Sequence, residues 1–467
     1  MTAGRGKEIE MTIDTRSATL RLADHTLGLR FEGLPAPVVQ RTKELFLDFL
    51  GVALGGRLAE STGPLVQAVS RLRAGQPGQA TVVGEGELYP PHYAALLNGA
   101  LAHSLDFDDT YREGVLHPGA PVFATLLALA EAETTSGRQF LTAAVAGYEV
   151  SCRLARAHGS AVHHRGFHPT ATTGIFGATA AGAHLLKLGP EALLDAWGLN
   201  LSQAAGSLQF LENGAWSKRV QVGLAASNAI IALVMAQEGV TGAAEPFSGR
   251  FGYYPCYAGV ECDLEEALSG LGQEFLVMQT AVKPYPSCRY NHSVIDACLE
   301  FVARGLAPPA DVQEVEIVLP PSGARIVAEP EERKRAPQNI VDAQFSVYFA
   351  AAVALQDGRF DWGSYRRIGD PAIASLMARM RAREASLPEM GAVVTIVSRG
   401  GRRYTLEVPV PTGEPERFPH WKELADKARS LARGTLPPDQ VEGLMEDVAR
   451  LDALEDMRDL TARLRPL

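Results

Sequence analysis

Between residues 37 and 270 the chain is built from Ala- and Leu-rich segments of helical length that are separated by Gly and Pro. The clearest segments are 37–54, 121–134, 139–158, 170–188, 190–205 and 220–238. Small residues dominate their faces, and small faces allow helices to pack at short interaxial distances. No strong alternating pattern, which would indicate a strand, occurs in this half of the chain. The pattern therefore predicts a large domain of packed helices.

The pattern changes after about residue 275. Residues 312–319 alternate apolar and acidic side chains, as expected of a half-buried strand. Residues 392–398 and 403–408 are rich in β-branched side chains, and the Arg-Gly-Gly-Arg sequence between them indicates a hairpin. Helical segments are predicted at 293–304, 342–356 and 371–383. This part of the chain therefore predicts a smaller α/β domain.

These patterns divide the chain into four parts. Residues 1–15 are polar and are predicted to form a disordered tail, and residues 16–274 form the helical domain. The α/β domain covers residues 275–410, and the helical pattern returns over residues 411–467. The simplest topology is a mainly α protein in which a large all-helical domain carries an inserted smaller α/β domain.

The net charge argues against two classes of partner. The chain has 44 Lys and Arg against 54 Asp and Glu, which gives a formal net charge of −10. Such a chain lacks the basic face of a nucleic-acid-binding protein and the basic clusters that hold proteins on anionic lipid. Hydrophobic residues make up 46% and charged residues 21%, which are values of an ordinary soluble globular protein. We therefore expect no nucleic-acid or membrane partner.

Cysteine usage and the N-terminus indicate a cytoplasmic protein. The five Cys are few and have no zinc-site spacing, so we expect reduced thiols. Residues 1–14 have no apolar core and do not resemble a signal peptide. Two long uncharged stretches, 166–186 and 220–237, carry polar side chains. We interpret both as helices buried inside protein rather than as membrane spans.

The most unusual motif is NGALAHSLDFDDT at residues 98–110, which is followed by His-Pro-Gly at 117–119. Its carboxylates Asp106, Asp108 and Asp109 formally match the motif of aspartyl-phosphate phosphatases, but no buried strand precedes them as that chemistry requires. A magnesium site is a second interpretation, although no further acidic motif completes it. A third interpretation is that these carboxylates cap the next helix.

Three further motifs are candidates for anion binding or catalysis. Residues 163–170 (HHRGFHPT) hold three His, but their spacing is not that of a known metal site, and a polar loop is the alternative. Residues 216–219 (WSKR) place two cations at a helix start, where they oppose the helix dipole, so either anion binding or a solvated loop explains them. Residues 283–292 (KPYPSCRYNH) lie at the junction of the two predicted domains, where ligand clefts concentrate. A Cys–His nucleophilic pair is one interpretation of this last motif.

Motifs for nucleotide binding and serine hydrolysis are missing from the sequence. There is no G-x-S-x-G, no Walker loop and no G-x-G-x-x-G between a strand and a helix. We therefore expect no nucleotide or dinucleotide cofactor.

Taken in order, these segments resemble the MmgE/PrpD family, which includes 2-methylcitrate dehydratase, cis-aconitate decarboxylase and iminodisuccinate epimerase. The resemblance rests on residues 98–110, 117–131, 166–186, 216–226, 283–292 and 342–355, which span most of the chain. It implies a large all-helical domain, a small α/β lid domain and a homodimer, and it implies no metal and no organic cofactor. Carried over position by position, it also implies that Asp106, Thr110, His117, His168, Lys218 and Lys283 line one pocket between the helical domain and the lid.

The reactions of this family make or quench a carbanion next to a carboxylate, so we assign expected roles accordingly. His117 is the expected acid/base, because an unperturbed imidazole titrates near neutral pH. Lys218 and Lys283 are expected to hold substrate carboxylates and to stabilise enediolate-like charge. Asp106 is expected to orient His117 or to act as a second base. His168 is expected to be a second proton carrier or a hydrogen-bond donor.

Five further side chains are candidate substrate-binding residues. His292 is an alternative second proton carrier, and Cys288 is either an acid/base or part of the pocket lining. Arg219 and Arg289 are expected to steer anions, and Tyr285 lies in the same motif as Cys288.

We therefore expect a cofactor-free lyase or isomerase, of the dehydratase, decarboxylase or epimerase type, that acts next to a carboxylate or carbonyl of a small carboxylate substrate. An isomerase or C–C bond-forming cyclase of secondary metabolism is the alternative within the same fold. A non-catalytic helical scaffold or binding protein is the alternative of a different class.

Overall fold

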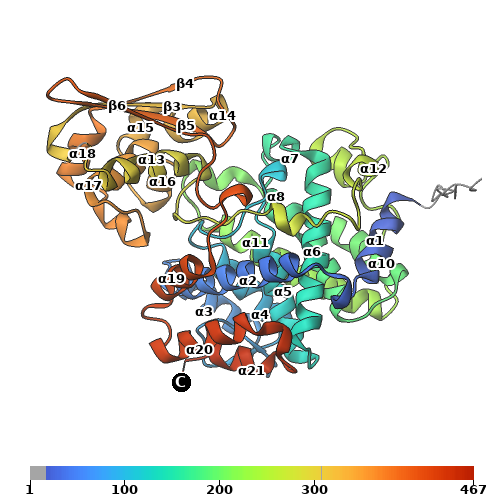
Figure 1. The fold of residues 1–467 in the computed structure, drawn as a ribbon. Helices are drawn as coiled ribbons and strands as arrows, with labels where there is room; N and C mark the ends of the chain where they lie inside the picture. Colours follow the sequence, from blue (N-terminus) through green and yellow to red (C-terminus); the bar gives the residue numbers. More distant parts are fainter. Residues whose placement is uncertain (1–16, 307, 467) are drawn as a thin grey trace, which may run out of the picture.

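The computed structural model describes residues 17–306 and 308–466, so the predicted disordered tail, residues 1–15, lies outside the described part of the chain. Figure 1 shows a large group of helices and, beside it, a sheet with its own helices. We call the first group, residues 18–282 and 421–464, the helical body. We call residues 292–408 the sheet unit. The described chain is mainly helical.

The helical body is built from the Ala- and Leu-rich segments of the sequence. Its longer helices are α1 (Ala18–Gly28), α2 (Ala36–Gly56), α3 (Thr62–Leu72), α4 (Pro91–Ala102), α5 (Gly119–Ala132), α6 (Gly137–His158), α9 (Gly174–Leu185), α10 (Pro190–Leu201), α11 (Ser217–Gln237), α19 (Trp421–Ala432) and α20 (Pro438–Ala449). Proline lies in the first turn of α2, α4 and α10. Backbone N–H groups in a first turn have no partner within the helix, so the N–H that proline lacks costs no helical hydrogen bond. A Cβ added at Gly223 of α11 would lie 2.1 Å from the Leu96 carbonyl oxygen of α4. The close contact between these two helices therefore requires Gly.

The structure differs from the sequence-based prediction at three places in the helical body. The predicted helix 170–188 is split at Thr173 into α8 (Pro169–Thr172) and α9. A short hairpin, β1 (Ala80–Thr81) and β2 (Leu88–Tyr89), was not predicted, because two-residue strands carry no alternation. Helix α11 begins at Ser217, so Lys218 and Arg219 lie in its first turn rather than before it.

The sheet unit contains a four-stranded sheet of order β4–β3–β5–β6. Three strands have the predicted bounds: β3 (Val312–Leu319), β5 (Ala392–Ser398) and β6 (Arg403–Val408). Strand β5 lies between the other two and pairs antiparallel with both. The alternation in β3 is confirmed, since its apolar side chains are buried. Helices α13 (His292–Ala303) and α17 (Val347–Asp357) pack together, and α13 contacts β5 and β6.

Two helical predictions in the sheet unit are wrong in part. Residues 371–383 form α18 (Pro371–Met377) followed by β4 (Met380–Glu384), because β4 pairs parallel with β3 along its whole length. Residues 342–356 form two helices, α16 (Ile340–Gln344) and α17, because the Ser346 side chain caps α17 by accepting a hydrogen bond from the Phe349 N–H.

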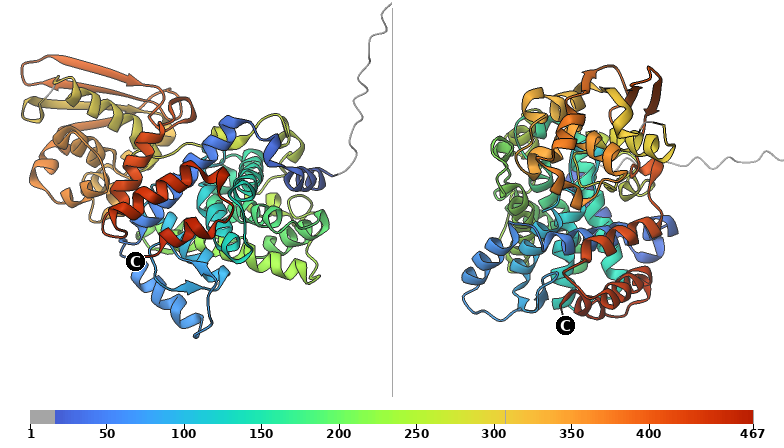
Figure 2. Two further views of the ribbon diagram at one scale, coloured as in Figure 1. Left: turned by 60° about the horizontal axis from the view of Figure 1, so that its bottom comes forward. Right: turned by 90° about the vertical axis from the view of Figure 1, so that its left-hand side faces the viewer.

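The apolar side chains form two main cores. One contains residues from Leu22 to Val282 together with residues from Leu424 to Leu464, and the other contains residues from Cys288 to Ile396. The chain therefore leaves the helical body for the sheet unit and then returns, and Figure 2 shows the C-terminal helices lying against the N-terminal ones. Helix α19 packs along α2, and its Lys427 contacts the backbone of Phe107 and Lys283 in two of the motifs found in the sequence.

Helix α11 is the single helix among the described residues that is long and apolar enough to cross a membrane by length and composition. It packs against α4, α9 and α10, and 56% of its most apolar window is buried. The predicted burial of this helix is therefore correct for one face. The opposite face exposes Leu224, Val234 and Met235.

Candidate active site

The DFDDT motif forms a buried loop that leaves the C-terminal end of α4. Asp106 in this loop has a φ of 52°, in the left-handed region where a non-Gly residue is strained. The backbone of Thr110 exchanges two hydrogen bonds of 2.8 Å with that of Ala281. This bridge brings the loop beside Lys283, which is far away in sequence, and it explains how two separate motifs form one site.

Asp106 is held between two ammonium groups. Lys218 Nζ donates a hydrogen bond of 2.6 Å to Asp106 Oδ1. Lys283 Nζ donates one of 2.8 Å to the Asp106 backbone carbonyl and lies 3.2 Å from Oδ1. Burial by itself would raise the pKa of Asp106, but the two lysines outweigh burial and hold that pKa well below its ordinary value. The carboxylate is therefore ionised, and it offsets only one of the two positive charges.

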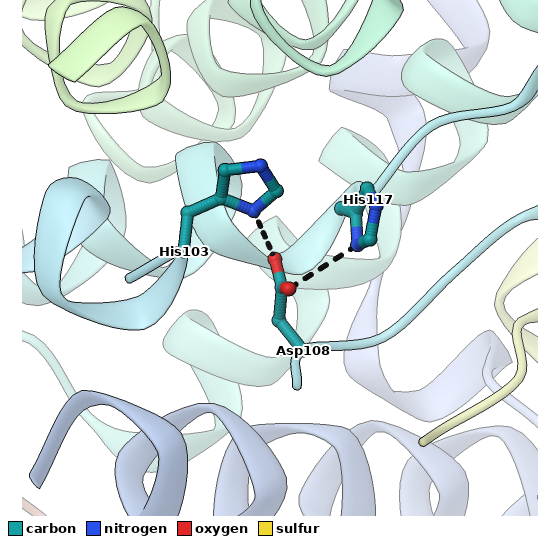
Figure 3. Close-up of side chains that lie close together, drawn as sticks. All are labelled: His103, Asp108 and His117. Carbon is teal, nitrogen blue, oxygen red and sulfur yellow. Dashed lines mark hydrogen bonds and ion pairs between the residues drawn. The ribbon is translucent and has the colours of Figure 1, made fainter. Parts of the chain in front are cut away.

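Asp108 lies between two imidazoles (Figure 3). Its Oδ2 is 2.7 Å from Nδ1 of His103, and its Oδ1 is 3.2 Å from Nδ1 of His117. His103 closes the C-terminal end of α4, and His117 precedes α5, so the loop between these helices carries both partners. The expected contact between Asp106 and His117 is not made, because the carboxylate that faces His117 is that of Asp108.

His103 is buried and has an unpartnered nitrogen. Burial lowers the pKa of His103 to about 4, so its ring is neutral near neutral pH. Nδ1 then carries the proton and donates it to Asp108, which leaves the lone pair on Nε2. Nε2 is buried and has no hydrogen-bond partner.

A third imidazole completes a cluster. The ring centroid of His103 lies 4.8 Å from that of His117 and 5.3 Å from that of His168. His168 Nδ1 is 3.1 Å from Gln221 Oε1, which fixes the ring. Burial lowers the pKa of His168 well below its ordinary value. The cluster therefore combines buried imidazoles with one shared carboxylate.

Asp109 points away from this cluster and caps α5. Its carboxylate accepts hydrogen bonds from the Gly119 N–H at 3.1 and 3.2 Å and from the Tyr148 hydroxyl at 2.6 Å. Burial is the main cause that raises the pKa of Asp109 to about 8. The interpretation of the motif as a helix cap is therefore correct for Asp109, while Asp106 and Asp108 bind side chains of the site.

A small cavity of about 30 Å³ lies between the helical body and the sheet unit. It is lined by His103, Ser104, Asp106, Phe210, Gly214, Ala215, Lys218, Arg219, Val341, Gln344 and Phe345. The last three belong to the sheet unit. Gln344 Nε2 donates a hydrogen bond of 2.8 Å to the Leu105 carbonyl, so the two parts are joined at the edge of the cavity. The lining combines two cations, Lys218 and Arg219, with the apolar side chains of Phe210, Val341 and Phe345.

Of the sequence-predicted site residues, Asp106, Lys218 and Arg219 line this cavity. The others lie outside its lining: Thr110, His117, His168, Lys283, Tyr285, Cys288, Arg289 and His292. Cys288 is buried, and burial raises the pKa of its thiol. Its backbone N–H donates to the Gln344 carbonyl at 2.9 Å. Tyr285 donates its hydroxyl proton to Asp296 Oδ1 at 2.7 Å. These contacts hold the segment that carries Lys283 against the sheet unit.

Arg289 and His292 also have structural partners. Arg289 Nε and Nη2 both donate to Glu414 Oε1, at 2.9 and 2.6 Å. Arg289 Nη1 lies 2.8 Å from His292 Nδ1, and His292 Nε2 lies 3.2 Å from the Ser287 carbonyl. Burial lowers the pKa of His292 well below its ordinary value. The two side chains expected to contact substrate therefore join the Lys283 segment to the segment that returns to the helical body.

Sequence reasoning did not assign roles to His103, Asp108, Gln344 and Lys427. His103 and Asp108 were within the quoted motif, but nothing local shows which of its side chains turn toward each other. Lys427 lies in a helical pattern with no motif, so no sequence signal singles it out.

One group among the described residues has the composition of a metal site. The ligand atoms of His103, Asp108 and His117 lie within 4.8 Å of one another. The His103 Nδ1 to Asp108 Oδ2 distance of 2.7 Å is that of a hydrogen bond, however, and two ligands of one zinc ion at about 2.0–2.2 Å stand farther apart in a tetrahedron. This arrangement is a carboxylate shared by two imidazoles, and its distances do not fit a tetrahedral zinc ion.

Comparison with known proteins assigns the chain to a family. The MmgE/PrpD N-terminal domain matches residues 20–263, and the MmgE/PrpD C-terminal domain matches residues 285–452. A cis-aconitate decarboxylase of Aspergillus terreus is 27% identical, with 93% of each chain covered. The cis-aconitate decarboxylases of Homo sapiens and Mus musculus are each 26% identical, and 96% of this chain is covered in both cases. The two domain models and the full-length relatives agree with one another, and the chain therefore belongs to the MmgE/PrpD family and is a lyase-type enzyme.

Proposed function

We propose that this enzyme makes and reprotonates a carbanion next to a carboxylate of a small anionic substrate, and that it does so without a metal or an organic cofactor. The observation that carries the proposal is the position of Asp106 between Lys218 and Lys283, beside a pair of imidazoles that share Asp108, at the wall of a cavity. Both requirements of the reaction, a cationic group and a proton carrier, are thus met within one site.

The lysines supply the electrostatic part of the reaction. A carbanion next to a carboxylate spreads its charge onto the carboxylate oxygens, so the transition state carries more negative charge there than the substrate does. Lys218 and Lys283 exceed the charge of Asp106 by one, and Arg219 adds a further cation to the cavity wall. Preorganised charges of this kind stabilise a transition state more strongly than water does, because they need not reorganise.

His117 supplies a proton in this proposal. Its imidazole side chain is 14% exposed, and its Nδ1 faces the Asp108 carboxylate. A carboxylate in this position orients the ring and stabilises the imidazolium. The Thr170 hydroxyl accepts a hydrogen bond of 3.2 Å from the His117 backbone N–H, which holds His117 beside α8.

The sheet unit serves as a lid in this proposal. Val341, Gln344 and Phe345 of this unit form part of the cavity lining. Separation of this unit from the helical body would open the cavity to substrate, and its return would exclude water and strengthen the charge interactions inside.

The first substrate to test is cis-aconitate, because the relatives that cover nearly the whole chain are named as decarboxylases of it. We expect purified enzyme to consume it, with products identified by NMR spectroscopy. We expect His117→Ala and Lys283→Ala each to reduce turnover by about 100-fold or more. His164→Ala is the matched control, since this histidine lies on the short helix α7 (Ala161–His164), whereas His117 and Lys283 contact Asp108 and Asp106. Full activity in both site variants would refute the proposal.

A second candidate, an isomerase or C–C bond-forming enzyme with a larger substrate, is favoured by the apolar lining residues Phe210, Val341 and Phe345. The two candidates are separated by a panel of carboxylates with and without an apolar substituent. A preference for the apolar members, with cis-aconitate left unchanged, would favour this candidate.

A further inference from the structure

His103 has a feature that its structural contacts do not explain. The residue is 1% exposed, lines the cavity, and presents Nε2 on the ring edge turned away from Asp108 (Figure 3). That nitrogen is buried without a hydrogen-bond partner. An unpaired polar atom in such a place costs stability, so a ligand that pairs with it is the simplest reason for its retention.

The tautomer of His103 is fixed by its surroundings. Asp108 Oδ2 is an acceptor 2.7 Å from Nδ1, so Nδ1 must carry the proton. Desolvation keeps the ring neutral, and Lys218 adds to this effect. Nε2 therefore carries a free lone pair and can accept a proton but has none to donate in the resting enzyme.

We infer that His103 is a second catalytic residue of this site and acts as the base, with Asp108 as the positioning residue that it shares with His117. This inference rests on the proposed carbanion chemistry. It goes beyond that proposal because it assigns removal of the proton and return of the proton to two different imidazoles. His103 removes a proton from the carbon next to the substrate carboxylate, and His117 returns one.

The C–H bond breaks, its proton goes to His103 Nε2, and its electron pair passes into the neighbouring carboxylate to form an enediolate that Lys218 and Lys283 stabilise. The imidazolium formed on His103 is balanced by Asp108, which is ionised and already hydrogen-bonded to Nδ1. His117 then gives a proton to the carbanion, and exchange with water restores the two rings.

A purely structural role for His103 would require only its Nδ1. The Asp108 contact uses that nitrogen alone, and an Asn side chain places an amide N–H in the same position. His103→Asn therefore keeps the donor to Asp108 and removes the base. His158→Asn is the matched control, because His158 is also a buried neutral histidine, but it pairs with the Gly159 carbonyl and Thr173 and does not line the cavity.

The experiment follows exchange of the methylene hydrogens of cis-aconitate with deuterium oxide by proton NMR. We expect wild-type enzyme and His158→Asn to catalyse this exchange and His103→Asn to be slower by about 100-fold or more. Tricarballylate, a saturated tricarboxylate that cannot form the same carbanion readily, is expected to raise the Tm of all three proteins, which shows that each variant still binds a tricarboxylate. Exchange by His103→Asn within a few-fold of wild type would overturn the inference.

A second measurement separates this inference from the proposed function. Tricarballylate is added to wild-type enzyme with ¹⁵N-labelled histidine, and the signal of His103 Nε2 is followed. A shift of this signal together with absent exchange in wild type would contradict the carbanion chemistry but support the placement of Nε2 against the ligand. An unchanged signal would overturn the role of His103, whatever the turnover.

Discussion

The ammonium group of Lys427 donates a hydrogen bond of 2.8 Å to the backbone carbonyl of Lys283. It donates two more, to the Phe107 carbonyl at 2.8 Å and to Asp48 Oδ1 at 2.7 Å. Lys427 lies on α19, which follows the sheet unit, and Asp48 lies on α2. One buried cation therefore joins the returning helix to both segments that carry the site.

We predict that Lys427→Met separates stability from activity. The substitution leaves the Asp48 carboxylate buried without its cation, which is expected to lower the free energy of unfolding by about 3–5 kcal/mol. The double variant Asp48→Asn, Lys427→Met has no buried charge and is expected to regain most of this stability. Neither variant can hold the Phe107 and Lys283 carbonyls, so both are expected to have reduced kcat. Urea denaturation and steady-state kinetics test this, and full kcat in the double variant would contradict it.

We predict that the same substitution affects KM differently at Arg219 and at Arg289. Arg219 lines the cavity and donates to Ser61 Oγ at 2.6 Å, without a carboxylate within ion-pair distance among the described residues. Arg219→Gln is therefore expected to raise KM for a carboxylate substrate by about 10- to 100-fold, since a hydrogen bond to a charged group contributes about 1.5–3 kcal/mol. Arg289→Gln is expected to leave KM unchanged.

The same substitution at Arg289 is expected to destabilise the fold. Glu414 is 1% exposed, and removal of the Arg289 guanidinium leaves only Arg112, 3.3 Å from Glu414 Oε2, as its cationic partner. A loss of about 1–3 kcal/mol in the free energy of unfolding is expected, because the hydrogen bonds of a buried carboxylate are lost while one cation remains. A large rise in KM with unchanged stability would show that Arg289 contacts substrate, as the sequence suggested.

We predict that the free energy of unfolding depends on pH through the carboxyl group of Asp109. The pKa of its carboxyl group is about 8 in the folded protein, and an Asp in an unfolded chain has a pKa of about 3.9. Between these values the folded state binds more protons than the unfolded state. The stability contributed by this group is therefore complete below about pH 3.9 and is lost as the pH rises through about 8.

Asp109→Asn removes this dependence and keeps the contacts, because its amide can accept from Gly119 and donate to Tyr148. We expect the free energy of unfolding of wild type to fall more steeply than that of the variant as the pH rises from about 5 to 8, by up to about 1.4 kcal/mol per pH unit. Denaturation at a series of pH values measures this. Parallel curves would show that Asp109 is ionised throughout, in spite of Asp48 and Asp108 nearby.

The exposed face of α11 predicts how two copies associate. Leu224, Val234 and Met235 are 43%, 51% and 43% exposed, which is unusual for three large apolar residues on one helix. We propose that a second copy of this chain covers this face. Leu224→Lys with Val234→Lys is therefore expected to convert a dimer into a monomer in light scattering, with little loss of secondary structure. A dimer that survives both changes would place the interface elsewhere.

The sequence by itself determined the local structure well. Strands β3, β5 and β6 follow from alternation and β-branched runs, and most helices follow from their composition and from Pro and Gly at their ends. It also indicated the motifs that contain Asp106, His117, Lys218 and Lys283. These signals depend on residues that are close in sequence, since the periods of helices and strands are only a few residues long.

The tertiary structure decided what depends on contacts between distant segments. Strand β4 exists because it pairs with β3, although its own sequence resembles the end of a helix. The partner of His117 is Asp108 rather than Asp106, because a left-handed residue turns the loop and Lys218 and Lys283 take up Asp106. His103 and Lys427 acquire their positions in the same way, through hydrogen bonds to groups that only the folded chain brings within reach. A local pattern cannot encode such contacts, because their energy depends on burial and on distances between segments that lie far apart in the sequence.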